Sequence, residues 1–185
     1  MSTKNVAVVV GSLRKDSLNR KLALVMREMA APSLSLNLVE IGHLPLYNQD
    51  DDEGPQVPEA WTTFRQSIKA NDAVLFVTPE YNRSVPAALK NAIDVGSRPH
   101  GQSAWDKKPA AIISVSPGAM GGFGANHHLR QSLVFLNMPT LQQPEAYLGH
   151  AAQLFDASGK LINDSTREFL SKFAQTFERW IATNT

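Results

Sequence analysis

Residues 11–19, with the sequence Gly-Ser-Leu-Arg-Lys-Asp-Ser-Leu-Asn, constrain the fold more than any other stretch of the chain. The five residues before them, 6–10, are all apolar and mostly β-branched, which is typical of a strand buried on both faces. After them, Leu22, Met26 and Met29 recur at three- and four-residue steps, the spacing of an amphipathic helix. The pattern therefore predicts a buried strand, a short polar turn and a helix.

A turn of this kind can bind phosphate, because the first amides of a helix lack internal partners and carry the positive end of its dipole. Ser12 and Ser17 add hydroxyls, Asn19 adds an amide, and Arg14 adds a forked guanidinium. The chain has neither G-x-x-x-x-G-K-[ST] nor G-x-G-x-x-G, so the turn suits a terminal monophosphate better than a nucleoside triphosphate or a dinucleotide. The simpler alternative is an ordinary turn in which Ser17 caps the helix, and the spacing leaves both open.

Strand and helix patterns alternate along the rest of the sequence. We predict further strands at residues 34–41, 73–77, 110–115 and about 138–141, and helices at residues 57–70, 86–95, 129–136 and 165–181. This alternation predicts a single α/β domain over residues 1–185, with a five-stranded parallel sheet between two layers of helices.

The connection over residues 42–58 is long, polar and proline-bearing, with the acidic run 50–53 at its centre. Such a run is more typical of a solvated loop than of a metal site. Because the connection is longer than usual, we expect it to form part of the wall of a site.

Three unusual loops, 11–19, 78–82 and 116–124, each follow a predicted strand. In a parallel sheet ligands bind beyond the carboxyl ends of the strands, and with strand order 2-1-3-4-5 these loops would meet at one edge. The second loop, Thr-Pro-Glu-Tyr-Asn, carries groups that could hold the edge of a flat heterocycle, and glycines in the third would allow close backbone approach. The simpler alternatives are a strand-ending turn and a flexible loop.

The composition excludes several classes of function. The 18 basic and 17 acidic residues nearly balance, which predicts neither nucleic-acid binding nor attraction to an anionic membrane. There is no cysteine, so electron transfer would need a bound cofactor. His127 and His128 lack the i, i+4 spacing of a helical metal pair, and we expect no metal site. Only five apolar residues lie between the start Met-Ser-Thr-Lys-Asn and Gly11, too few for a signal peptide or membrane span, which favours a cytoplasmic protein.

The motifs Gly-Ser-Leu-Arg-x-x-Ser-x-Asn, Thr-Pro-Glu-Tyr-Asn-x-Ser-Val-Pro and Ser-x-Gly-x-x-Gly-Gly occur in this order after the first, third and fourth predicted strands. Together they resemble the NADPH-dependent FMN reductases, and most nearly the bacterial quinone, chromate and azo-dye reductases. The resemblance implies a flavodoxin-like fold with strand order 2-1-3-4-5, bound FMN, and NADPH or NADH as co-substrate. It also implies ping-pong two-electron reduction of quinones, flavin, azo compounds or chromate, by a homodimer or homotetramer with sites at subunit contacts.

The resemblance also assigns roles by position. The chemistry occurs at N5 of the flavin, so no catalytic residue of the protein is expected. The residues that would bind the cofactor are Ser12, Arg14, Ser17, Leu18 and Asn19 around the phosphate, Pro79, Glu80, Tyr81 and Asn82 around the flavin ring, and Ser116 and Gly118 against its other side. The substrate side would hold Arg83, Gly121 and Gly122. Relatives often have an aromatic residue in place of Arg83 and a basic one in place of Gly124, which bears on acceptor choice and assembly.

A non-enzymatic electron carrier on the same fold is the main alternative. Carriers of the flavodoxin type tend to be acidic, whereas the calculated pI of this chain is 8.0. Oxidation of NAD(P)H by the purified protein would distinguish an enzyme from a carrier.

Overall fold

The computed structural model describes residues 3–185 and shows a five-stranded parallel sheet in the order β2-β1-β3-β4-β5, which confirms the predicted topology. The strands are β1 (Lys4–Val10), β2 (Leu34–Val39), β3 (Ala73–Thr78), β4 (Ala110–Val115) and β5 (Ala146–Leu148). The helices are α1 (Leu18–Met29), α2 (Gln49–Asp52), α3 (Glu59–Lys69), α4 (Ala87–Gly96), α5 (Phe123–Phe135) and α6 (Asp164–Asn184), with a 3-10 turn at Ala151–Gln153.

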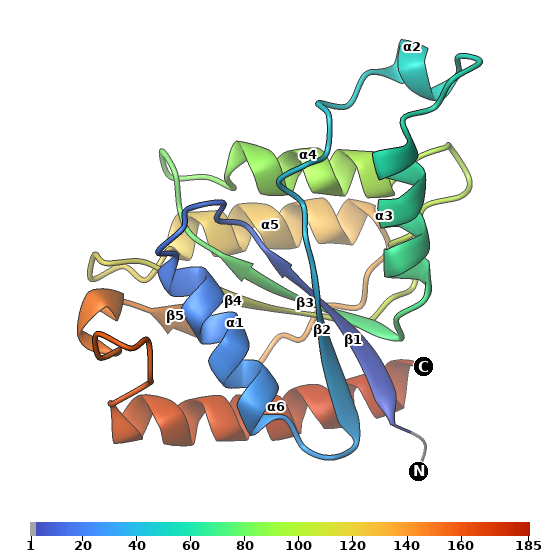
Figure 1. The fold of residues 1–185 in the computed structure, drawn as a ribbon. Coiled ribbons are helices and arrows are strands. Elements are labelled where there is room, and N and C mark those ends of the chain that lie inside the picture. Colours follow the sequence, from blue (N-terminus) through green and yellow to red (C-terminus); the bar gives the residue numbers. More distant parts are fainter. Residues whose placement is uncertain (1–2) are drawn as a thin grey trace.

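The sheet is covered on both faces (Figure 1). Helices α1 and α6 pack on one face, and α3, α4 and α5 pack on the other. Because successive strand residues point to opposite faces, Val6 and Val8 join the core under α1 and α6, whereas Ala7 and Val9 join the opposite core. A strand buried in this way needs apolar residues at every position, as residues 6–10 provide.

The parallel pairing brings all carboxyl ends of the strands to one edge of the sheet, and those of β1, β3, β4 and β5 point to the left in Figure 1. Val10 at the end of β1 pairs with Val77 near the end of β3, and Thr78 pairs with Ser114. The loops that follow β1, β3 and β4 therefore start beside one another.

The prediction of a fifth strand at residues 138–141 is wrong. Thr140 forms only an isolated bridge with Ala110, and the fifth strand lies at Ala146–Leu148. Pro139, inside the predicted segment, and Pro144, three residues beyond its end, have no N–H to give to a ladder. The true strand is three residues long, too short for an alternating pattern to identify it.

Helix α5 begins at Phe123, six residues before the predicted start. Its first turns contain Gly124, Asn126, His127 and His128, which interrupt the apolar spacing. The helix starts directly after the glycine-rich loop, so its first turn belongs to the same edge of the sheet as the three loops.

The acidic run predicted a solvated loop over residues 42–58, and this prediction is only partly correct. The connection contains the short helix α2, which stands away from the sheet at the top of Figure 1. The Asp52 side chain is only 3% exposed and forms two hydrogen bonds with Arg65, at 2.8 and 3.0 Å. One carboxylate of the run therefore fastens the connection to α3, while Asp50 and Asp51 remain exposed.

Candidate functional site

Hydrogen bonds connect the three loops, which confirms that they converge. The backbone N–H of Gly11 donates to the Val77 carbonyl at 2.9 Å, at the ends of β1 and β3. The Asn19 side chain donates to the Val115 carbonyl at 3.5 Å, at the end of β4. The Glu80 carboxylate accepts from the backbone N–H of Ala125 at 3.0 Å, in the first turn of α5. Four elements therefore form one continuous edge.

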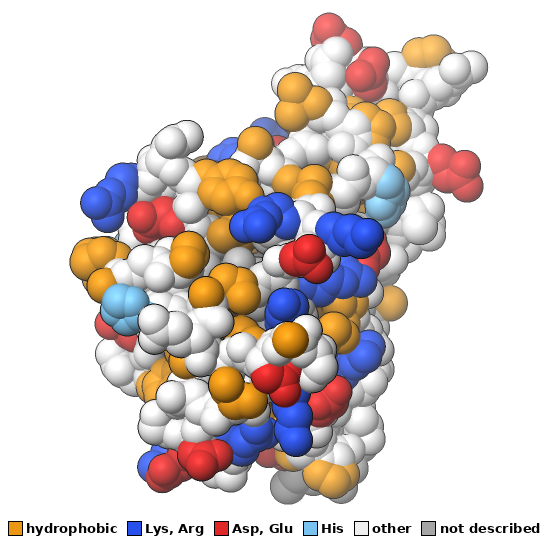
Figure 2. Space-filling model, turned by 60° about the vertical axis from the view of Figure 1, so that its left-hand side comes forward, with side chains coloured by type: hydrophobic (Ala, Val, Ile, Leu, Met, Phe, Trp, Pro, Cys, Tyr) orange, Lys and Arg blue, Asp and Glu red, His pale blue; other side chains and the backbone are white. Residues whose placement is uncertain are grey.

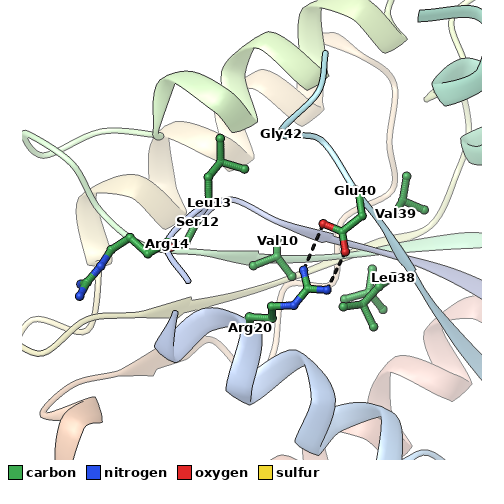
Figure 3. Close-up of a pocket in the computed structure, with 10 residues that line it drawn as sticks. Val10, Ser12, Leu13, Arg14, Arg20, Leu38, Val39, Glu40 and Gly42 are labelled. Atoms are coloured by element: carbon green, nitrogen blue, oxygen red, sulfur yellow. Dashed lines mark hydrogen bonds and ion pairs between the residues drawn. The ribbon is translucent and has the colours of Figure 1, made fainter. Parts of the chain in front are cut away.

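The turn between β1 and α1 has the features of an anion site. Ser17 caps the helix, and its hydroxyl accepts from the backbone N–H of Arg20 at 3.1 Å. The capping alternative is thus correct for Ser17, although its own hydroxyl proton can still be donated. Helix α1 begins at Leu18, so the free amides of its first turn face the turn, and Arg14 extends away from the sheet toward solvent (Figure 3).

Asn19 is oriented differently from the sequence-based expectation. The residue is 4% exposed, its amide donates to the Val115 carbonyl, and its Oδ1 has no partner among residues 3–185. In this conformation the side chain joins the start of α1 to the end of β4. A phosphate in the turn would meet the Asn19 backbone N–H, whereas its carboxamide faces inward.

A pocket of about 320 Å³ borders the same turn, on the side of β2. Ser12 and Arg14 line one end of the pocket. Along another wall, the Arg20 guanidinium donates two hydrogen bonds to the Glu40 carboxylate, at 2.7 and 3.1 Å, and forms a bidentate ion pair (Figure 3). The hydrogen bond from Arg20 lowers the pKa of Glu40 and raises the pKa of Arg20. The pocket includes no residue of the loops after β3 and β4, so it is a neighbour of the convergent edge rather than its centre.

The loop after β3 contains a tight turn. Tyr81 and Ser84 exchange backbone hydrogen bonds at 3.1 and 3.0 Å, and the two residues between them, Asn82 and Arg83, both have positive φ. Two central residues of positive φ are the signature of a type I′ turn, which asparagine tolerates well. The backbone explanation for Asn82 is thus sufficient, and the exposed side chains of Tyr81 and Asn82 remain available to a ligand.

The Glu80 side chain holds this turn against the start of α5. It is 13% exposed, accepts from the Ala125 N–H, and lies 3.8 Å from the guanidinium of Arg83. A Cβ at Gly124 would come within 2.8 Å of the Arg83 carbonyl oxygen and 2.9 Å of Glu80 Oε2. These distances explain why glycine occupies position 124 in this chain. The turn after β3 and helix α5 touch there, and no side chain fits.

The loop after β4 leaves part of its backbone open. The Gly118 N–H donates to Ser116 Oγ at 3.2 Å, and the Gly118 carbonyl accepts from the His150 N–H at 3.2 Å. Gly118 is exposed, and a Cβ built there would have only Ser116 Oγ nearby, at 3.7 Å. A flat ligand can therefore approach this stretch of backbone.

Gly121 and Gly122 do not face the open side of that loop, contrary to the prediction that they lie on the substrate side. Both are buried, with φ of 58° and 77°. A Cβ at Gly121 would lie 2.7 Å from the Tyr147 carbonyl carbon, and one at Gly122 would lie 3.0 Å from Ser114 Cβ. Backbone conformation and close packing explain both glycines.

Phe123, His127 and Tyr147 form an aromatic group beside this loop that the sequence did not reveal. The ring centroid of Phe123 lies 4.3 Å from that of His127 and 5.4 Å from that of Tyr147. His127 Nε2 lies 2.9 Å from the Tyr147 hydroxyl oxygen. Burial, with a smaller contribution from Glu145, raises the pKa of Tyr147 to about 12, so its hydroxyl stays protonated near neutral pH. The group joins α5 to β5, which are remote in sequence, and no local pattern connects them.

Residues 3–185 show neither a candidate metal site nor a candidate membrane span. No group of three His, Cys, Asp or Glu side chains in this part of the chain is placed to hold a metal ion. None of its helices combines the length and apolar character needed to cross a membrane.

Comparison with known proteins places these features in a family. Residues 4–153 match the family described as NADPH-dependent FMN reductase. The chain is 66% identical to a quinone reductase of Pseudomonas putida, over 97% of this chain and 96% of that protein. It is 46% identical to a 2-hydroxy-1,4-benzoquinone reductase of a Burkholderia species, over 95% of each. The structure of FerB from Paracoccus denitrificans, a flavoenzyme NAD(P)H:(acceptor) oxidoreductase, superposes with a TM-score of 0.91 at 43% identity, over 98% of this chain and 99% of that one.

Proposed function

The chain belongs to the NADPH-dependent FMN reductase family, and on that premise we propose that it is an FMN flavoenzyme that reduces quinones with NAD(P)H. The observation that supports this most directly is the joining of three loops and the first turn of α5 at one edge of the sheet. One end of that edge offers donors for a phosphate, and the other offers open backbone and exposed rings for a flat heterocycle.

The residues present suit FMN. The turn between β1 and α1 supplies the Ser12 and Ser17 hydroxyls, the Arg14 guanidinium and the amides of Leu18 and Asn19, all of which are donors to phosphate oxygens. Pro79, Glu80, Tyr81 and Asn82 would border the ring system on the side of β3, and Ser116 and Gly118 on the side of β4. Glu80 would act by holding this wall in place, since its carboxylate is already bonded to α5.

Bound FMN would supply the redox chemistry, as acceptor of a hydride from NAD(P)H and donor of two electrons to the quinone. The protein holds the two loops that border the ring at a fixed separation. Their connection through Glu80 and α5 would hold the ring between them, keep water away from the side next to the protein, and leave the solvent side for one flat substrate at a time. Successive use of one space by NAD(P)H and by the quinone predicts ping-pong kinetics.

Flavin, azo compounds and chromate are further acceptors that we propose, and a homodimer or homotetramer is the proposed assembly. Phe135 on α5 is 86% exposed and lines a groove of about 550 Å³ between α4 and α5, and the neighbouring Val134 is 75% exposed. Large exposed apolar side chains next to a groove are typical of a contact between subunits. Light scattering of the eluted protein would measure the number of chains.

In the decisive experiment, the absorption spectrum of the purified protein is recorded and the flavin released on denaturation is identified. NADPH and NADH are then each mixed with the flavin-loaded protein, first without and then with a quinone. Bound FMN with quinone-dependent oxidation of either nucleotide supports the proposal. Flavin binding without reduction by either nucleotide would instead identify an electron carrier.

A further inference from the structure

Arg83 lies at the tip of the turn after β3, and its position is well defined although its side chain is exposed. The side chain is 77% exposed, while the backbone has a φ of 64° within the Tyr81–Ser84 turn. The Arg83 carbonyl packs against Gly124 so closely that no side chain fits there. The charge of Arg83 is therefore presented to solvent from a turn held at both sides.

The nearest acid does not neutralise this charge effectively. Glu80 Oε1 lies 3.8 Å from the guanidinium, beyond hydrogen-bond distance, while Glu80 Oε2 accepts from the Ala125 N–H at 3.0 Å. An ion pair at that distance, with the cation mostly in water, contributes little. Arg83 thus keeps most of its attraction for another anion.

Exposed apolar side chains occur on the turn that carries Arg83 and on the segment that this turn touches. Gly124, which touches Arg83, directly follows Phe123, whose side chain is 44% exposed, and Tyr81 of the turn is 49% exposed. Met120, at the end of the neighbouring loop, is 58% exposed. Figure 2, which brings the left side of Figure 1 forward, shows hydrophobic side chains next to basic ones on this face. A cation beside exposed apolar surface suits a ligand that is flat, aromatic and negatively charged.

We propose that Arg83 makes the enzyme prefer acceptors that carry a negative charge on the quinone or other aromatic ring. This inference rests on the proposed function and names the class of acceptor that the same site takes best. The long-range attraction between one cation and one anion raises the rate of encounter and the occupancy of the site, without any change in the chemistry on the flavin.

The test compares two naphthoquinones, neutral 2-methyl-1,4-naphthoquinone and the anion 1,4-naphthoquinone-2-sulfonate, as oxidants of the reduced, FMN-loaded protein in stopped flow. Arg83→Gln removes the charge, and Arg83→Lys retains it. Lys172→Gln is the matched control, because Lys172 is also exposed and lies beside an acid, Glu168, but on α6 at the other face of the sheet. Working from the reduced protein keeps the binding of anionic NAD(P)H out of the measurement.

We expect Arg83→Gln to lower the second-order rate for the sulfonate relative to the neutral quinone by about three- to ten-fold at low salt, and much less at high salt. Arg83→Lys and Lys172→Gln should keep the original ratio. Because sulfonation also changes the reduction potential, inhibition of the neutral reaction by naphthalene-2-sulfonate gives a second measure, and Arg83→Gln should weaken it by a similar factor.

An unchanged ratio in Arg83→Gln, or an equal change in Lys172→Gln, would overturn the assignment. In either case the proposed function would still stand, provided that the unmutated protein reduces 2-methyl-1,4-naphthoquinone. Failure of the unmutated protein to bind FMN or to oxidise NAD(P)H would reject the proposed function itself, before Arg83 is considered.

Discussion

The carboxylate of Glu80 accepts a hydrogen bond from the backbone N–H of Ala125 at 3.0 Å, and this bond fastens the turn after β3 to the first turn of α5. The two residues are 45 positions apart in the sequence. This connection joins the two walls of the proposed flavin site, because α5 begins directly after the loop that carries Ser116 and Gly118. A negative side chain at the start of a helix also interacts favourably with the helix dipole.

Replacing Glu80 by alanine should therefore weaken both the fold and the site. Loss of a capping carboxylate typically costs about 0.5–2 kcal/mol, and the side chain is 13% exposed, so solvent will not fully compensate. We expect a decrease in the free energy of unfolding of the flavin-free protein of about 1–2 kcal/mol, with weaker binding of both FMN and riboflavin. Urea unfolding and flavin titration measure the two effects.

Glu168→Ala serves as the control, since Glu168 is an exposed acid paired with Lys172 on α6. It should leave the free energy of unfolding nearly unchanged. A Glu80→Ala protein as stable as this control would show that the bond to Ala125 is not needed.

The buried strands, the two helical layers and the three loops were predictable because each depends on local patterns that repeat along the chain, such as the apolar run at residues 6–10. The strand order, which decides which loops are neighbours, was implied only by the resemblance to a known family. The role of Glu80 was not predictable, because its partner is a backbone amide far away in sequence. The same is true of Asn19, whose amide points to Val115, and of the aromatic group of Phe123, His127 and Tyr147. Strand β5 was missed because three residues carry too little periodicity.

The pair of Asp52 and Arg65 illustrates a second limit of sequence patterns. Four consecutive acids predicted a solvated run, yet one of them is buried beneath the connection, and nothing in the run itself distinguishes it. Asp52→Ala should destabilise the protein by about 3–5 kcal/mol, since it leaves the Arg65 charge buried without a partner. Asp51→Ala, at the exposed neighbouring position, should change stability by less than about 0.5 kcal/mol.

Arg65→Met combined with Asp52→Ala should recover much of that loss, because no unpaired charge then remains. Urea unfolding measures the stability of Asp51→Ala, Asp52→Ala and the double variant. Equal destabilisation by Asp51→Ala and Asp52→Ala would mean that the ion pair contributes nothing.

The pair of Arg20 and Glu40 predicts a pH dependence. The hydrogen bond from Arg20 lowers the pKa of Glu40 in the folded protein, so the pair stabilises the fold above the unfolded pKa of about 4.3 and loses that effect as the pH falls through the folded pKa. The two side chains are 43% and 58% exposed, which limits the contribution to about 0.2–1 kcal/mol. Glu40→Gln should therefore be less stable than the unmutated protein at pH 7, and the difference should shrink as the pH falls below about 4.3. A difference in urea unfolding that persists at the lower pH would point to packing instead.

Arg14→Ala tests the assignment of the phosphate turn. A hydrogen bond to a charged group is worth about 1.5–3 kcal/mol, so the dissociation constant of FMN should rise roughly ten- to a hundred-fold. Riboflavin, which has no phosphate, should bind as before. Lys15→Ala, at the adjacent exposed position, is the control and should affect both flavins only slightly. Equal losses for FMN and riboflavin in Arg14→Ala would mean that Arg14 acts through folding.

Two glycines of one loop, Gly118 and Gly122, should respond oppositely to valine, because the structure gives them different surroundings. Gly122 is buried with a φ of 77°, and a Cβ there would lie 3.0 Å from Ser114 Cβ. A left-handed conformation costs a residue with a side chain roughly 1–2 kcal/mol before any clash is counted. We therefore expect Gly122→Val to lower the melting temperature by several degrees, at about 2–4 °C per kcal/mol for a chain of this size, with normal reduction and oxidation rates in the protein that remains folded.

Gly118 is exposed, and a Cβ there would meet only Ser116 Oγ, at 3.7 Å. Gly118→Val should leave the melting temperature of the flavin-free protein nearly unchanged. If the flavin ring lies against this backbone, the branched side chain will displace the ring or the nicotinamide above it, and a displacement near 1 Å can cost on the order of a hundred-fold in rate. Melting curves of the flavin-free variants, followed by stopped-flow reduction with NADPH, separate the two outcomes. A stable Gly118→Val protein that binds FMN and is reduced at the normal rate would remove Gly118 from the edge of the flavin site, whatever Gly122→Val does.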